Sequence, residues 1–159
     1  MRAIALAIAL SFAGSAASAA PRPRNERAVT IASAIDDSPG VLDAHARRRH
    51  GEIVRRAMLD VLQRSGADVR HAGMEPRQID VAVVGWRVTQ AAADLSVGAE
   101  LRVVVCDAHG RMLSIVTGRA TVSAPSRGAR IAELREQALA EAVGAMSRSL
   151  QSQLARATS

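Results

Sequence analysis

The sequence contains no lysine and no tyrosine, and it has one cysteine and one tryptophan. All 21 basic residues are therefore arginine, set against 15 acidic residues, and the formal net charge is +6. A GC-rich coding sequence explains this composition without function, whereas selection for bidentate binding of phosphate or carboxylate would explain it functionally. Because base or sugar stacking needs several aromatic faces, the lack of aromatics argues against carbohydrate- and single-strand-binding roles.

The first twenty residues have the three-part layout of a secretory signal peptide. Arg2 supplies a positive charge, residues 3–13 form an uncharged and mainly apolar run, and Ala17-Ser18-Ala19 is an A-x-A-type cleavage site. The run is shorter than the roughly 20 residues that span a bilayer. We therefore predict a signal peptide over 1–20, a flexible lead-in over 21–27, and a periplasmic or secreted mature protein.

The single cysteine, Cys106, bears on both lipid anchoring and catalysis. No cysteine follows the cleavage region, so the acylation site of a bacterial lipoprotein is missing and we expect no lipid anchor. One thiol cannot form an internal disulfide. Cys106 ends the valine-rich run 101–105, which favours a buried, inert thiol. The alternative is a small hydrolase or thiol enzyme that pairs Cys106 with His109 across a tight turn.

A helical pattern extends from Val41 to about Arg64. Ser38 and Pro39 fit an N-cap followed by proline at the first helical position, and Gly66 fits the residue just past the helix. The apolar residues recur at three- and four-residue spacing, which predicts one buried stripe: Ile53, Val54, Ala57, Met58, Val61 and Leu62. A short β-type run over 28–32 precedes this helix.

Three strand-like segments follow, over 79–89, 95–106 and 112–123. Asp107 to Gly110 fits a type I turn with glycine in the left-handed position. That turn predicts that Val105 faces Leu113 and Val103 faces Ile115, with a second bulge after Thr117-Gly118. A final helix is predicted over 129–155, with its stripe at Ile131, Leu134, Ala138, Ala142, Met146, Leu150 and Leu154.

The predicted order is thus β-α-β-β-β-α within a single α+β domain, residues 28–156. Three consecutive strands most simply form an antiparallel meander. Two amphipathic helices then cover one face, which gives a two-layer sandwich with a mostly antiparallel sheet.

The densest charge cluster contains Arg47, Arg48, Arg49 and Arg56. It fits a solvated helix face on which Glu52 pairs with a neighbouring arginine. It also fits an anion- or partner-binding patch that makes charge-assisted contacts to phosphate or carboxylate. Trp86 is predicted on the strand face of Ala82, Val84 and Val88, where it packs in the core or, if that face is uncovered, anchors a partner.

Metal and cofactor sites are not expected. The four histidines are scattered at positions 45, 50, 71 and 109, and His45 and His50 do not share a helix face. Asp36 and Asp37 are interpreted as acids placed before a helix for its dipole. No G-x-S-x-G elbow or glycine-rich phosphate loop occurs, so we expect no enzyme activity.

The element order and the hairpin Val103-Val-Val-Cys-Asp-Ala-His-Gly-Arg111 resemble small periplasmic envelope accessory domains. They are similar in arrangement to the amino-terminal domain of the translocation protein TolB. Such domains are docking modules, so the resemblance implies a non-catalytic binding module of the envelope. Its partner would be an envelope protein or an anionic envelope component rather than nucleic acid. A further alternative is a self-assembling structural subunit that pairs exposed sheet edges.

Overall fold

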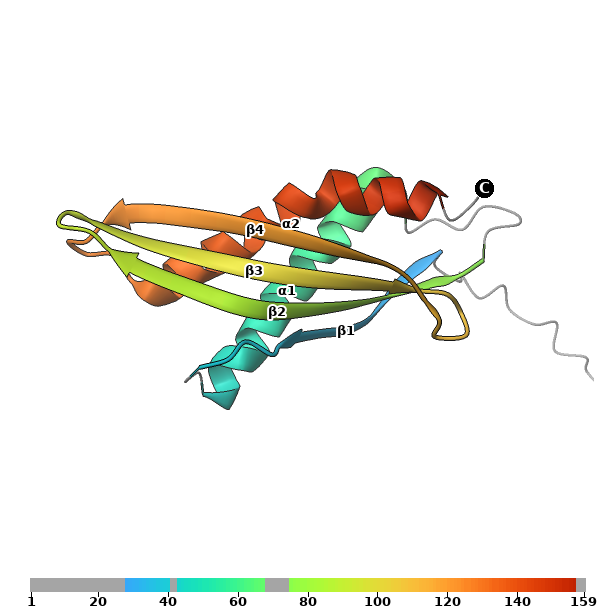
Figure 1. Ribbon diagram of the computed structural model, residues 1–159, viewed down its shortest axis with the longest axis horizontal. Helices are drawn as coiled ribbons and strands as arrows, with labels where there is room; N and C mark the ends of the chain where they lie inside the picture. The colour runs from blue at the N-terminus through green and yellow to red at the C-terminus, as the bar shows by residue number, and fades with distance from the viewer. Residues whose placement is uncertain (1–27, 41–42, 68–74, 157–159) are drawn as a thin grey trace, which may run out of the picture.

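The computed structural model describes residues 28–40, 43–67 and 75–156. The predicted signal peptide, the lead-in and His71 lie outside these residues. The elements in chain order are β1 (Val29–Asp36), α1 (Ala44–Ser65), β2 (Arg77–Gln90), β3 (Asp94–Cys106), β4 (Met112–Pro125) and α2 (Ile131–Arg156). The predicted α+β sandwich is confirmed, since a four-stranded sheet carries both helices on one face (Figure 1).

The sheet has the order β1-β2-β3-β4. β2, β3 and β4 form the predicted antiparallel meander, and β1 pairs with β2 in parallel. The connection between β1 and β2 contains α1. A helix of this length returns the chain to the end of the sheet where β1 began, so β2 can run in the same direction as β1. α1 packs mainly on β1, α2 packs mainly on β4 and β3, and the two helices contact each other.

The first helix has the predicted stripe but a different start. Val54, Met58, Val61 and Leu62 are buried, and Ile53 and Ala57 pack partly buried against them. Gly66 is left-handed (φ 66°) as predicted, and its N–H donates to the carbonyl of Gln63 at 3.1 Å. The predicted N-cap at Ser38 is wrong. Asp43 caps the helix by accepting from the N–H of Ala46 at 2.7 Å, while Ser38 bonds to the side chain of Asp36.

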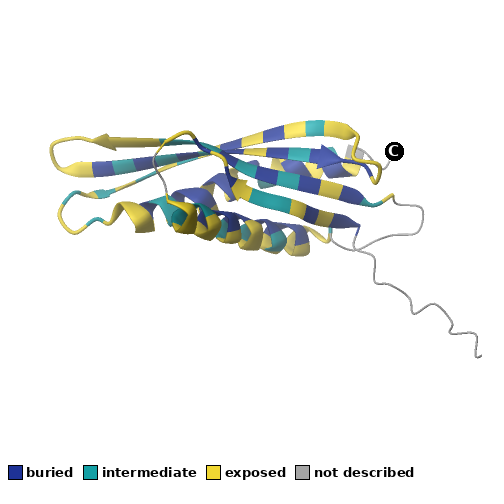
Figure 2. Cartoon of the chain, turned by 90° about the horizontal axis from the view of Figure 1, so that it is seen from below, coloured by how far each residue is buried: buried dark blue, intermediate teal, exposed yellow. Residues whose placement is uncertain are grey.

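The core lies between the helices and the sheet (Figure 2). α2 buries its predicted stripe except at Ile131, which is 42% exposed, and it adds Leu139 and Val143. From the sheet come Ile79, Val81, Val83, Val97, Leu101 and Val103, each less than 2% exposed. Full burial of one such aliphatic side chain stabilises the fold by about 1.5–3 kcal/mol.

Two glycines allow close helix–sheet contact. A Cβ on Gly51 of α1 would lie 2.5 Å from the carbonyl oxygen of Ala34 in β1. A Cβ on Gly118 of β4 would lie 2.5 Å from Cε of Met146 and 2.6 Å from the carbonyl oxygen of Ala142. These positions therefore set how closely each helix approaches the sheet.

The predicted register of the β3–β4 hairpin is wrong by one residue. Gly110 has the expected positive φ of 79°. However, Val105 pairs with Ser114 and Val103 with Val116, because a register shift next to Cys106 leaves Leu113 as an extra residue. Leu113 and Ile115 are consequently exposed. The second bulge predicted after Thr117-Gly118 is also wrong, since β4 pairs with β3 without interruption from Ser114 to Pro125.

Candidate functional site

A buried polar cluster lies where the end of β1 meets α1 and β2. The side chain of Asp36 is fully buried, and its carboxylate contacts Nδ1 of His50 at 2.6 Å and Nε1 of Trp86 at 3.3 Å. The N–H and the hydroxyl of Ser38 donate to its other oxygen. The rings of His50 and Trp86 have centroids 5.0 Å apart, and the guanidinium carbon of Arg135 in α2 lies 5.5 Å from the Trp86 centroid. Four elements thus meet at one indole.

The chain places these groups through its apolar periodicity and one strand irregularity. His50 lies one turn before Val54 on the buried stripe of α1, so its imidazole points at the sheet. In β2 the register shifts between Val83 and Gly85, and Trp86 then pairs with Ala99, whose side chain belongs to the core. Trp86 therefore lies half-buried on the helix-covered side.

The face predicted for Trp86 was accordingly wrong in part. Val88, which pairs with core residue Val97, shares the face of Trp86. Ala82 pairs with exposed Arg102 on the other face. Val84 is the extra residue of the bulge, which reverses the alternation of the strand. The packing role of Trp86 is confirmed, because it lies against the core cluster.

The carboxylate of Asp36 is held in its ionised form. Burial raises its pKa, but the hydrogen bonds from Ser38, His50 and Trp86 lower it, and the net pKa lies below the ordinary aspartate value. An ionised carboxylate only accepts hydrogen bonds, so Nδ1 of His50 carries the hydrogen of their bond. Asp36 thereby fixes both the orientation of the imidazole and the position of its ring hydrogen.

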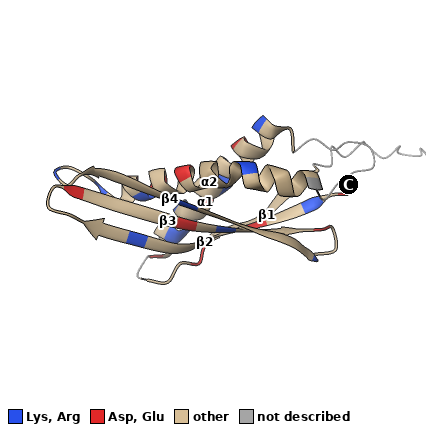
Figure 3. Ribbon diagram, turned by 45° about the horizontal axis from the view of Figure 1, so that its top comes forward, with Lys and Arg blue, Asp and Glu red and all other residues tan. Residues whose placement is uncertain are grey.

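The predicted arginine cluster divides between two sides of α1. Basic residues lie on the strands as well as on the helices (Figure 3). Arg47 turns toward β1 and donates to the carbonyl oxygens of Asp36, Ser38 and Gly40, each at 3.3 Å. Arg48, Arg49 and Arg56 are exposed. The ion pair of this exposed side joins Arg49 to Glu136 of α2 at 2.7 Å, whereas the sequence predicted Glu52 as the partner residue.

The exposed arginines line two adjoining depressions between the helices. One, here called the basic groove, is lined by His45, Arg48, Arg49 and Arg56 together with Glu52 and Glu136. The other, here called the interhelical cavity, has a volume of about 370 Å³. It is lined by His45, Arg49 and His50 of α1 and by Arg130, Glu133, Arg135 and Glu136 at the start of α2. The buried Asp36–His50 pair thus lies behind the interhelical cavity.

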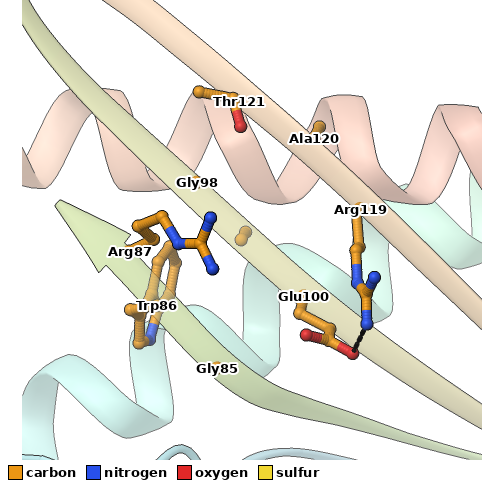
Figure 4. A pocket seen from close by; sticks show the side chains of 9 residues that line it. Gly85, Trp86, Arg87, Gly98, Glu100, Arg119, Ala120 and Thr121 are labelled. Carbon is orange, nitrogen blue, oxygen red and sulfur yellow. Dashed lines mark hydrogen bonds and ion pairs between the residues drawn. The ribbon is translucent and has the colours of Figure 1, made fainter. Parts of the chain in front are cut away.

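The open face of the sheet carries a different hollow, of about 290 Å³. It opens over Gly85 and Gly98 and is bordered by Arg87, Glu100 and Arg119 on neighbouring strands (Figure 4). Arg119 bonds to Glu100 at 2.8 Å, and this hydrogen bond lowers the pKa of the Glu100 carboxyl. A solvated antiparallel face accounts for this exposed ion pair.

Cys106 and His109, the residues of the alternative thiol-enzyme hypothesis, differ in burial. Cys106 is buried, as predicted, and His109 is exposed. Asp107 takes the hydrogen bonds of the turn, accepting from the N–H groups of His109 and Arg111, both at 2.9 Å. In the described part of the chain no hydrogen bond joins the thiol to the imidazole.

The two histidines of α1 differ in burial. His45 is exposed and His50 is buried, and both border the interhelical cavity. Within residues 28–40, 43–67 and 75–156, no group of three or more His, Cys, Asp or Glu side chains is arranged to hold a metal ion. Over the same residues, neither helix combines the length and the apolar character needed to cross a membrane.

Sequence reasoning missed the polar cluster itself. It assigned Asp36 to a helix dipole, which is wrong because α1 begins eight residues later, at Ala44. A usable signal was present, since His50 occupies a stripe position four residues before Val54. A buried imidazole needs a hydrogen-bond partner. The identity of that partner and the approach of Arg135 depend on long-range packing.

No family model matches the sequence, and no curated protein matches it. Solved structures resemble its fold. A minor lipoprotein from Acinetobacter baumannii has 11% identity and a TM-score of 0.51, over 74% of this chain and 88% of that chain. Protein CT253 from Chlamydia trachomatis has 9% identity and a TM-score of 0.48, over 80% and 97% of the two chains. At this identity, the Acinetobacter likeness shows a shared fold.

Proposed function

We propose that this chain is an exported, non-catalytic docking module of the cell envelope that binds an acidic envelope protein through the basic groove. The observation that carries the proposal is the exposed basic groove of α1, with Arg48, Arg49 and Arg56 beside Arg130 and Arg135 of the adjoining cavity. Exposed guanidinium groups at this density recognise carboxylates through charge-assisted hydrogen bonds.

A folded protein partner fits this surface better than a lipid surface. Glu52, Glu133 and Glu136 alternate with the arginines, so the charge pattern is mixed and calls for a complementary pattern. A helix that lies in a membrane interface inserts its apolar face. The apolar stripe of α1 is instead buried against the sheet.

The absence of a reaction is part of the proposal. An Asp–His pair activates a nucleophile only if a hydroxyl or thiol lies within reach of the free ring nitrogen. In the described part of the chain, His50 hydrogen-bonds to Asp36 alone and packs at a tilt against Trp86. The predicted signal peptide, the resemblance in element order to the TolB amino-terminal domain and the fold shared with a protein named a minor lipoprotein support an envelope location.

The test compares the mature protein with an Arg48→Glu, Arg56→Glu variant in pull-downs from envelope extract. The control is Arg102→Glu, Arg148→Glu, which makes the same charge change at exposed sites on β3 and α2. A protein retained by the parent and the control, lost in the test variant and weakened between about 50 and 150 mM salt supports the proposal. Equal retention by all three proteins contradicts it. Binding of phosphatidylglycerol vesicles that depends on the same arginines contradicts the choice of a protein partner.

A further inference from the structure

Two basic groups of the interhelical cavity have hydrogen-bonding capacity that the fold does not use. The side chain of His50 is only 6% exposed, and its Nδ1 is taken by Asp36. No residue of the described chain hydrogen-bonds to the other ring nitrogen, Nε2. Nε of Arg135 is buried and also has no hydrogen-bond partner among the described residues. Both side chains line the same cavity.

Trp86 brings these two groups together. The imidazole of His50 in α1 lies tilted against the indole with centroids 5.0 Å apart, and the guanidinium carbon of Arg135 in α2 lies 5.5 Å from the same ring centroid. Both are therefore held at one indole, and both border a space of about 370 Å³. A carboxylate side chain fits within this volume and has two oxygens, one for each of these two groups.

We propose that the interhelical cavity binds one carboxylate group, with Arg135 and Nε2–H of His50 as the donors and Asp36 as the positioning residue behind His50. This inference rests on the proposed function, because the carboxylate is taken to be an acidic side chain of the docked protein. It adds to that function a particular pocket and a particular chemical group.

The surrounding charges select for a carboxylate. Arginine offers only donors, which rules against a cationic ligand. Glu133 and Glu136 also border the cavity and repel a dianionic phosphate more strongly than a singly charged carboxylate. Glu136 is itself paired with Arg49 at 2.7 Å, which leaves Arg135 as the guanidinium above the indole.

Nε2 of His50 donates only from the imidazolium form, because Nδ1–H points at the Asp36 carboxylate and Nε2 of the neutral imidazole is an acceptor. The charged and titratable groups around the imidazole are Asp36 of β1, which it contacts, and those that line the same cavity: His45 and Arg49 of α1, and Arg130, Glu133, Arg135 and Glu136 of α2.

The experiment uses N-acetylglutamate amide as the probe and N-acetylglutamine amide as its uncharged control. Trp86 is the one tryptophan of a chain without tyrosine, so intrinsic fluorescence reports on this site directly. We expect a saturable change with the carboxylate probe and none with the amide. Arg135→Met should raise the Kd by about tenfold or more, since a charged donor is lost. Arg148→Met, an exposed arginine further along α2, should leave the Kd unchanged.

The same titration of a His50→Phe variant, which keeps a ring beside Trp86 and has no nitrogen donor, tests the second donor. A Kd raised by about tenfold or more supports the role of His50, and an unchanged Kd overturns it. Equal fluorescence responses to both probes, or an unchanged Kd for Arg135→Met, overturn the pocket. Circular dichroism checks that Arg135→Met is folded. If it is not, Arg135→Lys, which keeps the charge and loses the planar fork, must still weaken binding for the inference to hold.

Failure of this inference and failure of the proposed function give different results. Reversal of Arg48 and Arg56 should abolish docking and change the probe Kd by less than about threefold, because water and salt screen these exposed charges. If docking depends on Arg48 and Arg56 but the parent does not bind the probe, the proposed function holds and the carboxylate pocket is refuted. If the parent binds the probe through Arg135 but Arg135→Met still docks normally, the pocket exists and the carboxylate it binds does not come from the docked protein.

Discussion

Replacing Gly51 by alanine tests the close contact on which the polar cluster depends. Gly51 follows His50 in α1, and its Cβ would lie 2.5 Å from the carbonyl oxygen of Ala34 in β1. That oxygen belongs to main chain, so either the helix or the strand must move. Movement of α1 away from β1 lengthens the bond between His50 and Asp36, which joins the same two elements.

Two opposing effects set the expected change in the free energy of unfolding. Alanine stabilises a helix interior by about 0.5–1 kcal/mol relative to glycine. An overpacked contact costs about 1–3 kcal/mol. Gly144 of α2 supplies a matched control, because a Cβ there meets no heavy atom within 4 Å. Gly144→Ala should therefore raise the free energy of unfolding by about 0.5–1 kcal/mol. The free energy of unfolding of Gly51→Ala should be about 1–3 kcal/mol lower than that of Gly144→Ala.

Urea and thermal unfolding, followed by far-UV circular dichroism, measure both variants against the parent. For a domain of this size the difference between them corresponds to about 4 °C in Tm for each kcal/mol. Trp86 fluorescence should shift in Gly51→Ala and remain unchanged in Gly144→Ala, since only the former displaces His50. Equal stabilisation by both substitutions would refute the reasoning, because it would show that the α1–β1 contact tolerates a methyl group.

Three further outcomes are expected. Because the pKa of Asp36 is lowered in the folded protein, its contribution to stability is fully present above the unfolded-state pKa of about 3.9 and is lost as pH falls through the folded value. Urea unfolding at a series of acidic pH values should show this loss of stability, and Asp36→Asn should make the free energy of unfolding less dependent on pH there. The buried thiol of Cys106 should react slowly with a thiol dye in the native protein and rapidly in denaturant, and fast native labelling would contradict its burial. Amino-terminal sequencing of the exported protein should begin near Ala20 or Pro21, whereas an intact Met1 or an acylated chain would count against the signal peptide.

Local patterns were sufficient to predict the helices and the order of the strands. The stripe from Val54 to Leu62 and the one from Leu134 to Leu154 are buried as their spacing predicts. Helical periodicity can be recognised from residues only a few turns apart in the sequence. The left-handed glycine at 110 was also predictable from its turn sequence. These features depend on neighbours close along the chain.

Strand register was not predictable, because single extra residues decide it. Leu113 and Val84 each interrupt the alternation of a strand, and every side chain beyond them changes face. Trp86 was consequently assigned to the wrong set of neighbours. The contact of Asp36 with His50 and Trp86 spans 14 and 50 residues, so only the assembled fold brings these three together.

The arginines that α1 turns toward β1 restrict how this sheet can grow. Arg55 donates to the carbonyl oxygen of Ile31 at 3.0 and 3.2 Å, and Arg47 donates to that of Asp36 at 3.3 Å. β1 is an outer strand, so these guanidinium groups occupy carbonyls that an added strand would need. A filament built edge to edge requires two receptive edges in every subunit. Arginine bonds to two carbonyls of β1 disfavour pairing at that edge, so strand pairing between copies would favour β4, where a symmetric pair is complete with two chains and cannot propagate.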